Sequence, residues 1–265
     1  MAKSLVQAQF GANAANYSTS SVHAKGASLG RLIELVKPQS SWRVLDVATG
    51  GGHVAMAFAP HVREVVASDL TPQMLEETRR NAAAKGLGNI ATAEADAEEM
   101  PFEDASFDLV TCRIAPHHFP DIAVFVGEVR RVLRPGGVFA LVDNVAPDAA
   151  TTPGHSRAEL RDADLTYNAF EKIRDPSHGR ALTTGEWLEI VADTGLLVQH
   201  SEHQAKAMNF ADWCRNMSVP EDTVPRLAAM LREASPALRA FLKPADNDGA
   251  LTFELAELIL IAKKD

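Results

Sequence analysis

Short apolar runs alternate with longer segments of helical periodicity through most of this chain. The short runs are typical of buried parallel strands, and the longer segments repeat their apolar residues at the spacing of helices that cover a sheet. We expect strands at 43–47, 64–68, 90–94, 107–113, 137–143, 196–204 and 251–262. The alternation predicts an α/β fold with a doubly wound, seven-stranded, mostly parallel sheet and helices on both faces.

Capping and turn residues locate several helix ends. Thr71-Pro72 predicts a helix start, because threonine is a good N-cap and proline suits the first helical position. Thr183 and Glu186 have the spacing of a capping box, and Gly195 would end that helix. The segment 133–137, LRPGG, predicts a turn into the fifth strand, since its proline stops the preceding helix and its glycines permit positive φ.

The first predicted strand ends in a run of glycines. Residues 43–55 read RVLDVATGGGHVA. Glycines remove side chains that would keep a ligand off the backbone, and the helix expected from His53 would direct free amide groups at that ligand. Such a turn is typical of sites for dinucleotides or for S-adenosylmethionine. Gly50, Gly52 and Ala55 match the G-x-G-x-x-G/A spacing of the dinucleotide class, so the glycines leave both classes open.

Acidic residues at the next two strand ends favour the second class. Asp69 closes the second strand about 20 residues beyond the glycines, where a carboxylate can accept hydrogen bonds from ribose hydroxyls in either class. The third strand ends at Asp96-Ala97-Glu98, which would bring a carboxylate and backbone amides to an adenine edge. A dinucleotide site does not need this third element.

Four segments of the first half combine these features. They read VLDVATGGGHVA (44–55), VVASDLTPQML (65–75), ADAEEMPFEDASFDLVTCRIAPHHFPD (95–121) and LRPGGVFALVDN (133–144). In order and spacing they resemble the class I S-adenosylmethionine-dependent methyltransferases, specifically the small-molecule branch that includes the ubiquinone and menaquinone C-methyltransferases. The resemblance covers about residues 40 to 145. Ala48 departs from it, because the family's loop usually has its first glycine there, yet an added methyl group should leave binding intact.

The resemblance implies a Rossmann-like sheet with an antiparallel last strand in a single methyltransferase domain over 1–265. It implies an N-terminal lid at 1–39, for which the alternative is a helix that packs against the sheet. Helical cap insertions are expected at 145–182 and 205–250. The expected cofactor is S-adenosylmethionine, leaving as S-adenosylhomocysteine, and no metal is expected because the sulfonium methyl group is already activated for in-line displacement. The methyl acceptor would be a small molecule, whose identity and reacting atom the sequence does not give.

The residues expected to bind this cofactor lie at the strand ends and in the lid. Asp46 would suit the cationic sulfonium, or would only brace the glycine loop. Arg113 would pair with the methionine carboxylate, or would form a surface salt bridge. The expected set is Tyr17, Asp46, Ala48, Gly50, Gly52, Asp69, Leu70, Met74, Asp96, Ala97, Glu98 and Arg113.

Two histidines in the loop after the fourth strand are the candidate catalytic residues. If the acceptor is a hydroxyl or a carbon acid, a base is needed, and this loop offers His117 and His118 for that role. The alternatives are a packing role for either histidine, or for His118 a place in the cofactor site.

Composition narrows the class of protein. The 265 residues are 46% hydrophobic, enough for one large core. A formal net charge of −9 argues against a nucleic-acid partner, because phosphate binding needs basic clusters. Cys112 and Cys214 fall in different predicted elements, and no charged-then-apolar leader or membrane-length apolar run is visible, so we expect a cytoplasmic protein without disulfides.

Two other functions remain open at this point. A nicotinamide-dependent oxidoreductase would use the glycines and Asp69 but would leave the acids at 96–98 and the antiparallel strand unexplained. A catalytically silent protein that only binds S-adenosylmethionine would keep the same sheet. The sequence gives no oligomeric state.

Overall fold

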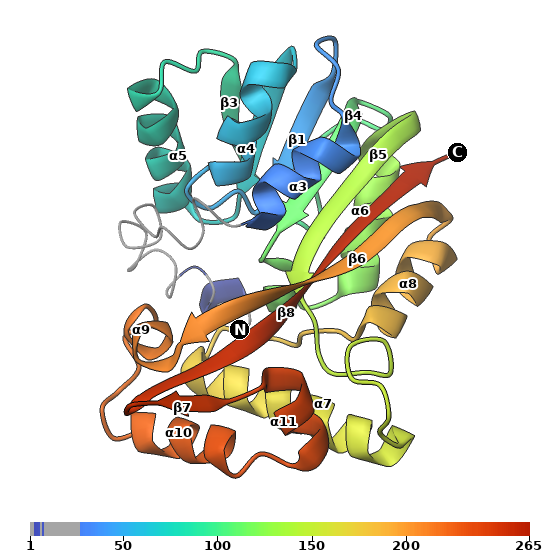
Figure 1. Ribbon diagram of the computed structural model, residues 1–265. Helices are drawn as coiled ribbons and strands as arrows, with labels where there is room; N and C mark the ends of the chain where they lie inside the picture. Colours follow the sequence, from blue (N-terminus) through green and yellow to red (C-terminus); the bar gives the residue numbers. More distant parts are fainter. Residues whose placement is uncertain (1–2, 6, 8–26) are drawn as a thin grey trace.

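A single sheet organises the protein (Figure 1). The computed structural model describes residues 3–5, 7 and 27–265, and in these it has one eight-stranded sheet of order β3-β2-β1-β4-β5-β8-β6, with β7 paired to β8 outside this path. Strands β1 to β5 are parallel, whereas β8 runs antiparallel to β5, β6 and β7. The strands are β1 Arg43–Val47, β2 Glu64–Asp69, β3 Ile90–Glu94, β4 Phe107–Arg113, β5 Leu133–Asn144, β6 Leu196–Asn209, β7 Ala245–Asn247 and β8 Ala250–Lys264.

Helices cover both faces of the sheet, as a doubly wound fold requires. On one face Leu32 of α3 and Phe58 of α4 pack with Val44 of β1. On the other face Phe125 of α6 and Trp187 of α8 belong to the core that includes the next residue of β1, Leu45. The helices of the sheet layers are α3 Ala27–Val36, α4 His53–Phe58, α5 Pro72–Ala84, α6 Ile122–Val132 and α8 Thr184–Asp193, with 3-10 turns η1 Ala59–His61 and η2 Pro116–His118.

A second apolar core lies beyond the carboxyl edge of the parallel strands. Strands β6 and β8 extend past the rest of the sheet and carry four helices at that end (Figure 1). These helices are α7 Arg157–Arg174, α9 Phe210–Arg215, α10 Val224–Arg232 and α11 Pro236–Leu242. Phe170 of α7 stacks on Trp213 of α9 with ring centroids 4.6 Å apart, and Phe253 of β8 meets both rings edge-on. We call this helical layer the cap.

The α/β architecture and the antiparallel last strand confirm the predicted fold, and the Thr183–Glu186 capping box is present. The sheet has eight strands and not the expected seven, because β7 pairs with β8. Two of the expected segments also have other boundaries. Strand β5 begins at Leu133, because the expected turn pairs irregularly with β4 between Phe107 and Leu109. The segment 205–250, expected to be helical, begins in β6 and ends with β7, because the long β8 pairs with both strands there.

Within the described ranges, no helix combines the length and hydropathy that crossing a bilayer requires. Both cysteines are buried and unpaired with each other, Cys112 in β4 and Cys214 in α9.

Candidate functional site

A pocket opens at the carboxyl ends of β1 to β4, where the strand order changes direction between β1 and β4. Crevices at this position are the usual ligand sites of open α/β sheets. Its lining contains ten of the twelve residues expected to bind the cofactor: Asp46, Ala48, Gly50, Asp69, Leu70, Met74, Asp96, Ala97, Glu98 and Arg113. Of the other two, Gly52 is not part of this lining and Tyr17 lies outside the described residues. His118 lines the pocket and His117 does not.

The glycine loop is held by two side chains from the second and third turns of α5. Thr78 Oγ1 donates to the carbonyl oxygen of Gly50 at 2.8 Å, and Asn81 Nδ2 donates to that of Gly51 at 3.0 Å. Gly52 has φ of 80°, and a Cβ there would lie 2.8 Å from Thr78 Cγ2. Gly52 therefore allows α4 to begin close against α5, whereas Gly50 faces open space, with nothing within 4 Å of an added Cβ.

Asp46 is buried beneath this loop. Its carboxylate accepts hydrogen bonds from Thr49 Oγ1 at 2.5 Å, Thr111 Oγ1 at 2.7 Å and the Ala55 amide at 3.2 Å. Burial raises the pKa of Asp46 to about 6, although these hydrogen bonds oppose the shift. Asp46 thus joins β1, β4 and the start of α4, which is the bracing role, while it also reaches the pocket wall.

Asp69 connects the second strand to the loop. Its two carboxylate oxygens accept from the Gly50 amide and the Thr71 amide, each at 2.9 Å. Burial raises the pKa of Asp69, and the two amides oppose that rise. Asp69 is 9% exposed and lines the pocket.

The acids after β3 form a corner of the pocket together with Lys3. The Lys3 ammonium pairs with the carboxylates of Asp96 and Glu98, the second at 2.7 Å from Oε2. Hydrogen bonds to these two acids raise the pKa of Lys3. Lys3 was not among the residues expected at the site, because nothing in the sequence around this lysine indicates which carboxylates it will contact.

Strand β4 ends at Arg113, and the residue that follows it, Ile114, has a strained backbone. Arg113 lies largely buried in the pocket wall, its Nε donates to Ser28 Oγ at 3.3 Å, and burial lowers its pKa. The surface salt bridge is therefore not its environment. Ile114 follows with φ of 54°, which is unusual for a β-branched residue. This conformation turns the chain out of β4 into the histidines, and such strain is concentrated at functional sites.

Ala48 also has a left-handed backbone, with φ of 51°. An L-residue pays about 1–2 kcal/mol for this conformation, partly offset because alanine restricts the unfolded chain by about 0.4–1 kcal/mol more than glycine does. We expect Ala48→Gly to raise the free energy of unfolding by up to about 1 kcal/mol, measured by urea denaturation.

Ala105 provides the matched control, because it has φ of 50° in an exposed turn outside the pocket. Ala105→Gly should give a similar gain. A loss of stability in Ala48→Gly alone would show that its methyl group packs usefully in the loop.

His117 is held by an aspartate at the end of β5. Asp143 Oδ1 lies 2.6 Å from His117 Nδ1, and Asp143 Oδ2 accepts from the His117 amide at 3.0 Å. Burial opposes protonation of this ring, but the charge and hydrogen bond of Asp143 outweigh it and raise the pKa of His117. The carboxylate fixes the proton on Nδ1, so Nε2 presents a lone pair in the neutral ring.

His118 has the opposite character. Its Nδ1 lies 3.1 Å from the carbonyl oxygen of Ser177, which can only accept, so Nδ1 carries the proton. Burial, and then the charge of His117 at a ring distance of 4.3 Å, lower the pKa of His118 to about 3. His118 therefore stays neutral at the pocket wall while His117 takes up a proton.

Asp143, the partner of His117, was not among the residues expected at the site. It stands at the end of the quoted segment LRPGGVFALVDN, and the signal was an acid at the end of a strand beside the strand that leads to His117. Among the residues that the structure describes, no cluster of three or more histidine, cysteine or acidic side chains has the arrangement of a metal site.

Known proteins resemble this chain in sequence and structure. A family model described as a methyltransferase domain matches residues 45–141. The uncharacterized methyltransferase YcgJ of Bacillus subtilis is 34% identical over 230 residues, which make up 87% of each chain. The solved structure of YcgJ has a TM-score of 0.82 at 33% identity and covers 89% of this chain and 97% of its own. A demethylmenaquinone methyltransferase of Deinococcus radiodurans is 46% identical over 40% of this chain and 44% of its own. These comparisons give no support to the dinucleotide-dependent alternative.

Proposed function

We propose that this protein, which belongs to the family of S-adenosylmethionine-dependent methyltransferases, methylates a small-molecule acceptor from which His117 removes a proton. The observation that carries the proposal is the Asp143–His117 pair beside the pocket. Asp143 orients the ring and stabilises its protonated form, as a base requires. The Nε2 atom is the site that receives the proton, because Nδ1 is occupied by Asp143.

The pocket residues suit the cofactor. Gly50 faces open space, so the backbone can approach a ligand closely. Asp69 and the acids at 96 and 98 offer acceptors for ribose hydroxyls and an exocyclic amine, and Arg113 offers a cation for a carboxylate. S-adenosylmethionine, when bound, supplies a methyl group that is already activated on sulfur. The chain then has to hold the acceptor in line, exclude water and accept its proton.

The cap is the natural wall for the acceptor. Tyr167 and Glu171 lie one turn apart on α7, and the Tyr167 hydroxyl and one Glu171 oxygen are buried without a hydrogen-bond partner among the described residues. The charge of Glu171 acts on the His117 ring and raises its pKa, so the two groups are neighbours. Buried polar atoms without partners are the groups that a bound polar molecule satisfies. We assign acceptor selection to the insertions 145–182 and 205–250, which supply the cap helices.

Thermal unfolding with separate ligands tests the cofactor half. S-adenosylmethionine or S-adenosylhomocysteine at about 100 times its dissociation constant should add about 2.7 kcal/mol to the native state, and NADH should add nothing. Asp69→Ala should lose most of that shift, because the ribose acceptor and the brace on Gly50 both disappear. A shift with NADH alone would overturn the assignment.

Transfer of a labelled methyl group to a panel of phenols, enols, amines and thiols tests the other half. We expect label in acceptors that must lose a proton, with no change when a chelator is added. Binding of both adenosyl ligands without transfer to any acceptor would favour the catalytically silent protein instead.

A further inference from the structure

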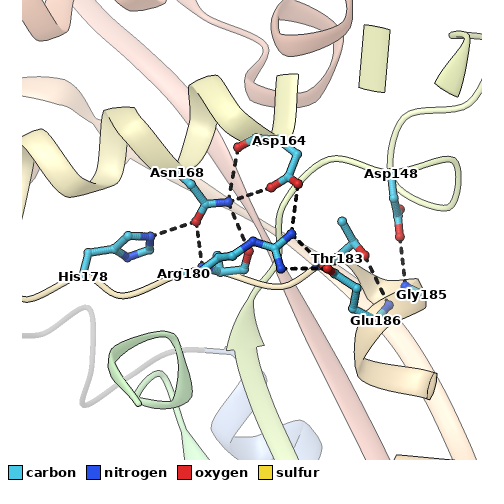
Figure 2. Close-up of polar contacts among 9 residues, drawn as sticks. Asp148, Asp164, Asn168, His178, Arg180, Thr183, Gly185 and Glu186 are labelled. Atoms are coloured by element: carbon cyan, nitrogen blue, oxygen red, sulfur yellow. Dashed lines mark hydrogen bonds and ion pairs between the residues drawn. The ribbon is translucent and has the colours of Figure 1, made fainter. Parts of the chain in front are cut away.

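The side chain of Asn168 joins α7 to the segment that follows it (Figure 2). Its Nδ2 donates to Asp164 Oδ1 at 2.7 Å, and its Oδ1 accepts from the Ala181 amide at 2.8 Å. A carboxylate only accepts and a backbone amide only donates, so these partners fix which end of the side chain is oxygen. The same Oδ1 lies 3.0 Å from His178 Nε2. His178 therefore carries its proton on Nε2, and Nδ1 is bare in the neutral ring.

The Asn168 side chain belongs to a network of hydrogen bonds and ion pairs that continues to the surface. Arg180 donates to Asp164 Oδ2 at 3.1 Å and to Glu186 Oε1 at 2.7 Å. Glu186 in turn closes the capping box of α8 with Thr183 (Figure 2). The network connects the segment between α7 and α8 to both helices, so this segment is held at both ends.

The same segment is also hydrogen-bonded to the backbone of His117. The amides of Gly179 and Arg180 both donate to the His117 carbonyl oxygen, at 2.8 and 3.0 Å. A Cβ on Gly179 would lie 2.9 Å from that oxygen, so the close approach requires glycine. The His178 ring lies 5.5 Å from the His117 ring between centroids. A change of charge at His178 would therefore act directly on His117.

The charged neighbours of the two rings differ in sign. Burial lowers the pKa of His117, but three negative charges raise it: those of Asp143 in β5, Glu171 in α7 and Asp175 in the segment between α7 and α8. The His118 ring packs beside the His117 ring.

The charged groups near His178 are positive, in contrast to the acids near His117. Burial, and to a lesser extent the positive charges of His117, His118, Lys172 and Arg174, together lower the pKa of His178 to about 2. Two cationic rings this close would repel each other, so we expect His117 and His178 to carry at most one positive charge between them.

We propose that Asn168 is a positioning residue: its amide oxygen holds His178 in the Nε2-protonated tautomer and, because it carries no charge, does not favour a charged His178 ring. His117 is then the imidazole that takes up the proton. A carboxylate at this position would instead stabilise a charged His178 and draw the proton away from His117. The inference deepens the proposed function, since it concerns the base of that same site. The arrangement of the rings, however, is open to measurement without cofactor or acceptor.

Long-range ¹H–¹⁵N NMR of the histidine rings, recorded from pH 5 to 9, tests the proposal. In the unaltered protein we expect His178 to remain the neutral Nε2–H tautomer throughout and His117 to titrate above the ordinary histidine value. In Asn168→Asp, His178 should begin to titrate within this range and the pKa of His117 should fall by at least about one unit. A charged His178 in the unaltered protein, or a His117 titration that Asn168→Asp leaves in place, would overturn the proposal.

Asn168→Ala is the matched variant, because it removes the acceptor without adding charge. It should give a mixture of His178 tautomers with little movement of the His117 titration, whereas a merely structural role would make both variants behave alike. If Asn168→Asp does not fold, the double variant D164N/N168D provides a donor opposite the new carboxylate. It should show the same two changes, titration of His178 within this pH range and a lower pKa of His117. Failure to bind S-adenosylhomocysteine, measured separately by calorimetry, would count against the proposed function and not against this titration order.

Discussion

Replacing Asp143 by Asn should lower the rate of methyl transfer by roughly 10²- to 10⁴-fold, the usual contribution of a positioned general base. The amide group of asparagine would face His117 Nδ1 with a donor, so the ring would carry its proton on Nε2 and lose the lone pair that the proposed base needs. Because His117 is not part of the pocket lining, the affinity for S-adenosylhomocysteine should stay the same. Initial rates with the best acceptor of the panel, together with calorimetry, measure the two effects.

The pH dependence provides an independent readout. Asp143 raises the pKa of His117, and a base acts only when deprotonated, so kcat/KM should rise with pH through a midpoint above about 6.5. In Asp143→Asn that midpoint should move to lower pH. Asp108→Asn is the control, since Asp108 lies at the opposite end of β4 and pairs with Arg134. Full activity of Asp143→Asn would exclude His117 as the base.

The features that were predictable from the sequence are those whose residues are close together in the chain. The glycine loop, its preceding acid and the capping box of α8 each occupy a short window, because backbone conformation and capping depend on neighbouring residues. Asp69 was also predictable, since the spacing between the first and second strand ends is set by one helix. The glycine loop, its preceding acid and Asp69 place the pocket at the carboxyl ends of the parallel strands.

The partner of His117 was not predictable in the same way. Asp143 is 26 positions away, and the two meet only because β4 and β5 pair in one register. Asn168 and His178 require in addition that the segment after α7 folds back onto the loop after β4. Nothing local distinguishes such an asparagine from an ordinary exposed helix residue. The long pairing of β6 with β8 is a tertiary effect of the same kind.

The second large effect is the pH dependence of the free energy of unfolding, which we expect from the buried carboxylate of Asp46 under the glycine loop. Because burial raises the pKa of Asp46 to about 6 from its ordinary value of 3.8, the folded protein binds more protons here than the unfolded chain does between these values. Stability from this residue is therefore greatest below about pH 4 and falls as pH rises to about 6, by about 3 kcal/mol in total. The pH profile of the free energy of unfolding, measured with urea, contains this fall.

Asp46→Asn should remove that fall, because an amide has no charge to desolvate and the hydroxyls of Thr49 and Thr111 can rotate to donate or accept. The free energy of unfolding of the variant, relative to the unaltered protein, should grow by about 3 kcal/mol from pH 4 to pH 7. All other titrating groups are common to both proteins and cancel in this difference. Asp222→Asn, at an exposed carboxylate, gives the baseline for deleting one charge. A difference that stays constant with pH would show that Asp46 ionises in the folded protein as it does in the unfolded chain.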